Sequence, residues 1–159
     1  SFLSSIYKDY KNTTDIEEEF HYESNIRNHL VSIGGPVHNP LTHKLLELIN
    51  SPITFDNISH EIVDKNTGTQ YIAEVRDEFI IKDYGLIIRT NNPFNKERTV
   101  TILAGSRTYG TLSSAEALTM PFLKTLLREL GDSKNFALLL HVYPPGKPEI
   151  IKFYNLDKQ

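Results

Sequence analysis

The chain contains no cysteine, and its only methionine is Met120. The absence of cysteine excludes disulfide bonds, thiolate metal sites and a cysteine nucleophile, and it fits a reducing compartment. No apolar run approaches the roughly 20 residues that a helix needs to cross a bilayer, and no signal-peptide pattern opens the sequence. We therefore expect no membrane contact and predict a cytoplasmic location.

An excess of basic charge is also missing. The chain has 17 Lys and Arg residues against 20 Asp and Glu residues, which gives a net charge of −3. The basic residues are scattered rather than clustered. A nucleic-acid-binding surface requires a concentrated positive field, so we expect no nucleic acid to bind this domain.

The length and the first residues suggest one domain of a larger protein. A chain of 159 residues with 39% hydrophobic content can build one ordinary core. It begins with Ser1 rather than with methionine, so we expect further segments in the full-length protein. We predict a helical adaptor segment over residues 1–28 and an α/β domain over residues 29–159. The adaptor helix would contact a neighbouring domain or a second copy of the chain.

The α/β domain begins with a strand, a glycine turn and a helix. The apolar run "HLVSIG" ends at Gly34-Gly35-Pro36, and Asn39 and Pro40 occupy the preferred first positions of a helix. Further along, "ISHEIVDKNTGTQYIAEV" predicts a hairpin with its turn at residues 66–68. Later strands are predicted over residues 84–90, 99–105, 136–143 and 149–156.

A second helical region is predicted between the last strands. Ser113 and Glu116 match a capping box and predict a helix start, Pro121 interrupts the helix, and Gly131 ends it. This order of elements predicts a three-layer Rossmann-like α/β domain. Its sheet would be mixed and mainly parallel, with an inserted β-hairpin and an N-terminal helix.

Three polar loops would line the carboxyl edge of such a sheet, where ligands bind in open α/β folds. They span residues 34–39, 91–95 and 105–111. Two of them lead into helices, whose N–H groups favour an anion, and Arg107 adds a cation suited to phosphate or carboxylate. The predicted ligand-binding residues are Gly34, Gly35, Asn39, Asn92, Asn95, Gly105, Ser106, Arg107, Gly110 and Thr111.

Each of these residues also has a purely structural explanation. The paired glycines of the first loop allow a sharp turn, and Asn39 is a good helix cap. Asn92 and Asn95 are typical of loops that brace themselves by side-chain hydrogen bonds. Gly105 and Gly110 could be packing glycines between helix and sheet, and Arg107 an ordinary surface arginine.

The familiar catalytic and metal-binding motifs are absent. The sequence has no Walker-type phosphate loop, no G-x-G-x-x-G, no G-x-S-x-G and no H-E-x-x-H. His38 and His43 lack metal-ligand spacing, and His141 lies in a predicted core strand. We therefore expect no metal and no cofactor. Glu116 could act as a general acid or base, although its capping-box position already explains it.

Three motifs together carry a resemblance. The turn "GGPVHNP", the strand "DYGLI" followed by "NPFN", and the turn "AGSRTYGT" lie within residues 29–119. This stretch resembles Rossmann-like modules of archaeal S-layer proteins. It is also similar to C-terminal sensor-like domains that bacterial regulatory proteins carry behind a DNA-binding domain. The first resemblance implies an exported structural module and the second a cytoplasmic sensor. We favour the second, because nothing in the sequence selects export.

These observations lead to one prediction of function and two alternatives. We predict a non-catalytic ligand-sensing domain of a larger bacterial regulatory or signalling protein. Its ligand would be a small, nucleotide-like anion bound at the carboxyl edge of the sheet. The first alternative is a nucleotide N-glycosidase or transferase that uses Glu116. The second is a structural assembly module in which the three loops are only corners.

Overall fold

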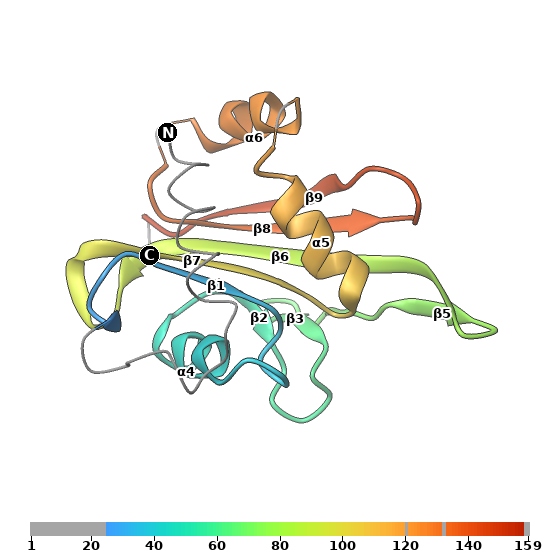
Figure 1. Cartoon of the computed structure of the whole chain (residues 1–159), viewed down its shortest axis with the longest axis horizontal. Coiled ribbons are helices and arrows are strands. Elements are labelled where there is room, and N and C mark those ends of the chain that lie inside the picture. The colour runs from blue at the N-terminus through green and yellow to red at the C-terminus, as the bar shows by residue number, and fades with distance from the viewer. Residues whose placement is uncertain (1–24, 120, 132, 158–159) are drawn as a thin grey trace.

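The structure, a computed structural model, describes residues 25–119, 121–131 and 133–157. The predicted helical adaptor segment, residues 1–28, falls almost entirely outside the described residues. The described part is a mixed α/β fold whose main sheet has the strand order β1-β7-β6-β8-β9 (Figure 1). These strands are β1 (Leu30–Ile33), β6 (Phe79–Asn92), β7 (Asn95–Gly105), β8 (Phe136–Val142) and β9 (Glu149–Asn155).

The prediction of a mainly parallel sheet is wrong. Only β1 and β7 run parallel, whereas β7, β6, β8 and β9 pair antiparallel with one another. Central strands of this sheet read as continuous apolar runs because both of their faces are covered, and burial on both faces does not reveal strand direction. The two residues between β6 and β7 are too few for the crossover that parallel neighbours require.

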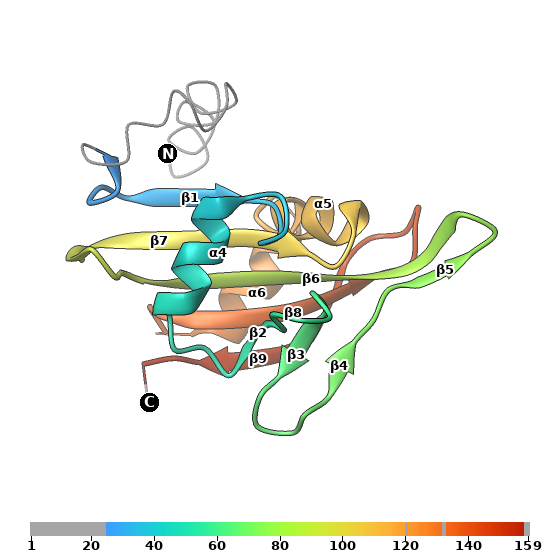
Figure 2. The same ribbon diagram turned by 90° about the horizontal axis from the view of Figure 1, so that it is seen from below.

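One face of the main sheet is covered by α4 (Pro40–Leu48) and by a small sheet of β2 (Ile53–Phe55), β3 (Ile62–Asp64) and β4 (Gln70–Tyr71) (Figure 2). The predicted hairpin is confirmed, since β3 and β4 pair antiparallel. Its turn closes through a hydrogen bond from Gly68 N to the carbonyl oxygen of Asp64, at 2.8 Å.

The opposite face carries α5 (Thr108–Glu116) and α6 (Phe122–Leu130). The predicted helix start at Ser113 is wrong, because α5 begins at Thr108 and Ser113 is buried inside it. Gly131 ends α6 with a positive φ of 52°, as the sequence predicted. No helix within the described ranges is long and apolar enough to span a membrane.

Side chains that alternate along β6 divide the core between these two faces. Leu86 and Ile88 pack toward α4 and the small sheet, whereas Ile87 packs toward α5 and α6. All three side chains are completely buried. The two cores hold α4 and α5 on opposite faces of the main sheet.

Candidate functional site

The first predicted loop, residues 34–39, is a turn that is tightly braced from within. Gly34 has a φ of 110°, a conformation that favours glycine. The Asn39 side chain accepts a hydrogen bond from Thr42 N at 3.1 Å and donates to the carbonyl oxygen of Ile33 at 2.9 Å. Thr42 Oγ1 donates to the carbonyl oxygen of Gly34 at 3.0 Å. Asn39 therefore caps α4 and holds the end of β1 at the same time.

The predicted loop at residues 105–111 is organised by an aspartate that was not among the predicted site residues. The buried carboxylate of Asp83 accepts hydrogen bonds from Tyr84 N at 2.8 Å, Arg107 N at 3.1 Å and Gly110 N at 2.6 Å. Asp83 thus caps the start of α5 from the neighbouring strand. A charged residue at the edge of the apolar run "YGLII" was the signal that could have revealed it.

Burial raises the pKa of the Asp83 carboxyl above its usual range, and the N–H groups of Gly110, Tyr84 and Arg107 oppose the rise without overcoming it. The Asp83 carboxylate already occupies the position in which a bound anion would have met the amides of α5. The start of α5 is therefore less attractive to a second anion than the sequence alone suggested.

Glycines bring α5 into direct backbone contact with the sheet. A Cβ atom on Gly85 would lie 2.6 Å from the carbonyl oxygen of Gly110, and one on Gly110 would overlap the carbonyl oxygen of Tyr84. A Cβ atom on Gly105 would likewise overlap the backbone of Gly110 and Thr111. Ser114 Oγ completes the contact by donating to the carbonyl oxygen of Ala104, at 2.8 Å. Gly105 and Gly110 thus act as packing glycines.

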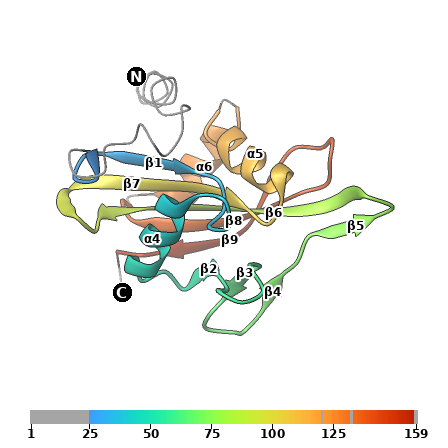
Figure 3. The ribbon, with the colours of Figure 1, turned by 60° about the horizontal axis from the view of Figure 1, so that its bottom comes forward.

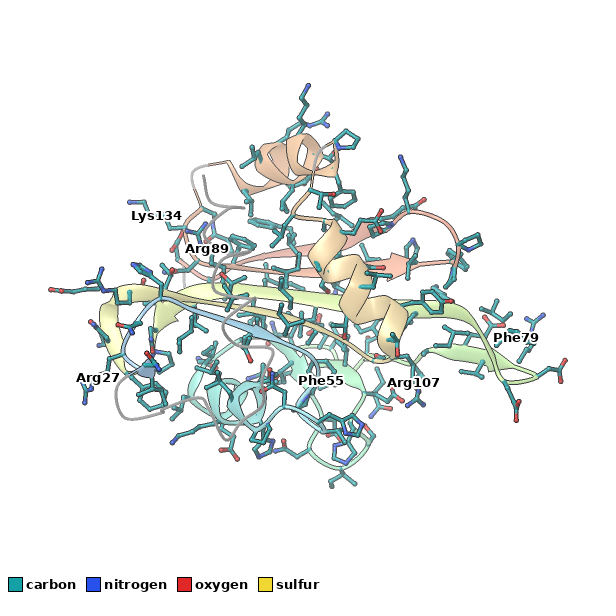
Figure 4. All side chains as sticks on the ribbon, in the orientation of Figure 1. Arg27, Phe55, Phe79, Arg89, Arg107 and Lys134 are labelled. Carbon is teal, nitrogen blue, oxygen red and sulfur yellow. The ribbon has the colours of Figure 1, made fainter. Side chains whose placement is uncertain are left out.

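The loops at residues 34–39 and 105–111 lie side by side, as predicted, because β1 and β7 run parallel and end at the same edge. Gly34 N donates to the carbonyl oxygen of Leu103 at 2.8 Å. A Cβ atom on Gly35 would lie 3.4 Å from the carbonyl oxygen of Gly105. Arg107 is exposed beside this junction, at the start of α5 (Figure 4).

The loop at residues 91–95 does not join them, so the prediction that all three loops share one edge is wrong. Because β6 runs antiparallel to β7, residues 91–95 lie at the other end of the sheet. Asn92 Nδ2 donates to the carbonyl oxygens of Ile26 and Asn28, at 2.9 and 2.7 Å. Asn95 Nδ2 donates to the carbonyl oxygen of Arg27, at 3.0 Å. Figure 4 shows Arg27 and Arg107 toward opposite ends of the sheet.

The remaining candidates lie apart from the junction. Glu116 is exposed at the last turn of α5, about 12 Å along the helix from Thr108. His43 lies 3.3 Å from Glu47 on α4, and the half-buried His141 lies 3.1 Å from Glu149. Within the described residues, no three side chains of the metal-binding types come together.

Two further features were missed by the sequence analysis. Lys82 Nζ lies over the rings of Tyr84 and Tyr143, 5.0 and 5.2 Å from their centroids. A hollow of about 380 Å³ lies between α6 and β9, with Phe122, Ile150 and Phe153 among its lining residues. Neither feature involves a predicted ligand residue. Periodicity could not reveal them, because each also depends on a residue from a distant part of the sequence, such as Tyr143 for Lys82.

A scan against protein-family models, a search of curated proteins and a search of solved structures each found no match to this chain. The resemblance to S-layer and regulatory modules therefore stays a prediction that depends on the three sequence motifs.

Proposed function

We propose that this chain is a non-catalytic binding domain of a larger bacterial regulatory protein, and that it senses a small anion such as a nucleotide. The observation that carries this proposal is the meeting of the two glycine turns beside the exposed guanidinium of Arg107. An arginine fork suits phosphate and carboxylate oxygens. The protein's own backbone fills the space beside Gly105 and Gly110, so a close approach of the ligand to the backbone would be at Gly34 and Gly35.

The contacts around Asp83 sharpen the proposal. Since that carboxylate already accepts from Arg107 N and Gly110 N, the amides at the start of α5 cannot be the main source of attraction. The Arg107 side chain would supply it, with the hydroxyls of Ser106 and Thr111 as further polar groups of the same loop. Gly34, Gly35, Asn39, Gly105 and Gly110 would shape the site rather than select the ligand.

Titration with ATP, GTP and inorganic phosphate, followed by amide chemical shifts, tests this assignment. We expect shifts at residues 34–37 and 106–111. Arg107→Ala should weaken binding about tenfold or more, which corresponds to the loss of one charge-assisted contact. Arg107→Lys should retain part of the affinity, because it keeps the charge but not the fork.

Arg128→Ala is the matched control, because Arg128 is an exposed arginine on α6, away from the junction. The affinity of the Arg128→Ala variant for the same three anions should equal that of the unchanged protein. Shifts confined to the hollow between α6 and β9, or equal losses in both alanine variants, would contradict the assignment. A complete lack of shifts would favour the structural assembly module instead.

The enzyme alternative receives less support from the arrangement of residues. Glu116 lies at the far end of α5 from Arg107, so one small nucleotide would not easily contact both. Incubation with NAD and nucleotides should therefore release no base. Release that disappears in Glu116→Gln would establish the enzyme alternative and refute the non-catalytic proposal.

A further inference from the structure

A two-stranded arm projects from the main sheet (Figures 2 and 3). It consists of β5 (Glu74–Arg76) and the first residues of β6. Strand β6 pairs with β8 only from Asp83 onward and with β7 only from Gly85 onward. Among the described residues, the opposite edge of β5 is not paired with any strand. The arm therefore offers an open strand edge beyond the body of the protein.

The arm is held in a defined conformation. Its turn residues, Asp77 and Glu78, have φ values of 48° and 69°, which identify the two-residue turn that matches the twist of a hairpin. At its root, Lys82 is held over the rings of Tyr84 and Tyr143. A preformed arm of this kind can act in recognition without first being ordered.

The arm also exposes more apolar surface than a hairpin in water favours. Val75 and Phe79 are 48% and 73% exposed, and Ile72, just before the arm, is 56% exposed. An isolated pair of strands is only marginally stable, and exposed edges are usually protected by charged side chains, lysine above all, or by proline. Strand β5 contains no lysine or proline, and its two charged residues, Glu74 and Arg76, are of opposite sign. These features suit an edge that pairs with another strand.

The sequence of β5 identifies that strand as another β5. Arg76 and Phe79 flank the two-residue turn and pair with each other, so the N–H and C=O of Val75 point to the outer edge. We propose that β5 pairs antiparallel with β5 of a second copy, about a two-fold axis at Val75. Each Val75 would then exchange both backbone hydrogen bonds with its counterpart.

Charge fixes this register. Glu74 and Arg76 already form an ion pair within the strand. With Val75 on the axis, Glu74 of each copy lies opposite Arg76 of the other, which is the favourable cross-strand arrangement. An axis at Glu74 or at Arg76 would instead place like charges opposite each other. The edge is therefore complementary to itself in one register, as a two-fold interface requires.

The product would be a four-stranded ribbon in which Val75 and Ile80 of both copies share one face, since Val75 and Ile80 are partners within each arm. Three or more strands with an apolar face are stable where two are not. The interface is short, so association should be weak and should increase with protein concentration.

Crosslinking gives the most direct test, because the chain has no cysteine of its own. Val75→Cys should form a covalent dimer under mild oxidation, since the two introduced thiols would meet at the axis. Val37→Cys is the matched control, because Val37 is similarly exposed, at 55%, but lies in the first turn. Crosslinking of neither variant, or of both equally, would overturn the proposal.

Charge exchange tests the register by sedimentation equilibrium. Glu74→Arg and Arg76→Glu should each weaken self-association roughly five- to tenfold, because each places two pairs of like charges across the axis. The double variant E74R/R76E should return the dissociation constant to within about threefold of the original. Failure of the double variant to recover would overturn the register, and a monomer at all concentrations would overturn the dimer.

Val75→Pro separates pairing from folding. Proline is tolerated where an edge N–H faces solvent, but it cannot donate to a second copy. The variant should keep its thermal unfolding midpoint and lose self-association at least tenfold. Unchanged self-association in a folded V75P protein would contradict the proposal, and the charge variants decide the question if V75P does not fold.

Discussion

Asp83 and Asp64 are both buried, and they connect the main sheet to its two covering layers in different ways. Asp83 accepts only backbone hydrogen bonds, from Tyr84, Arg107 and Gly110. Asp64, in β3, accepts from the Asn66 amide at 2.9 Å and, unlike Asp83, also from two side chains, Lys152 Nζ at 2.9 Å and Tyr154 Oη at 2.7 Å. The first aspartate thus fixes a helix start, and the second ties the small sheet to β9.

The two environments move the carboxyl pKa in opposite directions. Burial raises the pKa of Asp83, and the amides that surround it do not compensate. Burial also acts to raise the pKa of Asp64, but the Lys152 ammonium, the Tyr154 hydroxyl and the Asn66 amide together outweigh it, so the pKa of Asp64 is lowered. Direct hydrogen bonds from Lys152 and Tyr154 thus distinguish Asp64 from Asp83, whose carboxylate accepts from amides and is favoured further by the charge of Arg107.

Gly110→Ala, on the face of the sheet that carries α5, should have the largest effect on the free energy of unfolding. The added methyl would overlap the carbonyl oxygen of Tyr84, a backbone atom of a central strand that cannot move aside. We expect the free energy of unfolding to fall by about 3 kcal/mol or more. Urea denaturation measures it. Tyr109→Ala, an exposed change one residue earlier, should stay within about 0.5 kcal/mol, and equal effects would contradict close packing of α5.

Asp83→Ala should be the next largest change. It leaves the amides of Tyr84, Arg107 and Gly110 without their acceptor, and we expect a loss of about 2–4 kcal/mol in the free energy of unfolding. Asp64→Ala should cost less, because Lys152 is partly exposed and its ammonium can turn to water. A larger loss for Asp64→Ala in the same denaturation experiment would reverse our view of which aspartate is structurally dominant.

The sequence predicted local structure more accurately than strand direction. The cap at Asn39, the hairpin turn at residues 66–68 and the helix end at Gly131 were predicted correctly, because each depends on a few neighbouring residues. The mainly parallel sheet was predicted wrongly, because apolar runs report burial alone. The short link between β6 and β7 carried the missing information.

Site prediction was limited in the same way. The meeting of the turns at residues 34–39 and 105–111 followed correctly from strand, turn and helix patterns. The place of Asn92 and Asn95 did not, because it depended on the direction of β6. Asp83 escaped notice because its partners lie 24 and 27 residues away along the chain, and no local pattern connects them.

The pH dependence of stability should separate the two aspartates. Because the pKa of Asp83 is raised on folding, the native state binds its proton more tightly than the unfolded chain does. The contribution of Asp83 therefore falls as pH rises from the ordinary carboxyl pKa, 3.8, through its raised value. Asp64 has a lowered pKa, so its contribution falls as pH drops below 3.8.

Urea denaturation at several pH values measures these two contributions. Asp83→Asn should remove the loss of stability just above pH 3.8, whereas Asp64→Asn should flatten the loss on the acid side. The difference from the unchanged protein isolates each residue, since all other carboxyl groups are common to both. Identical differences for the two variants would show that the contrast between their environments is wrong.

Tyr154→Phe should have the smallest effect. It removes the hydroxyl that donates to Asp64 and keeps the ring, so we expect the free energy of unfolding to fall by about 0.5–1.5 kcal/mol. Tyr109→Phe, on the exposed side of α5, is the control and should change it by less than about 0.5 kcal/mol. The pKa of Asp64 should rise in Tyr154→Phe, because one of the three groups that outweigh its burial is gone. The loss of stability on the acid side would still begin near pH 3.8, but it would end at a higher pH and be smaller in total. A profile that does not change would assign the lowered pKa to Lys152 and the Asn66 amide.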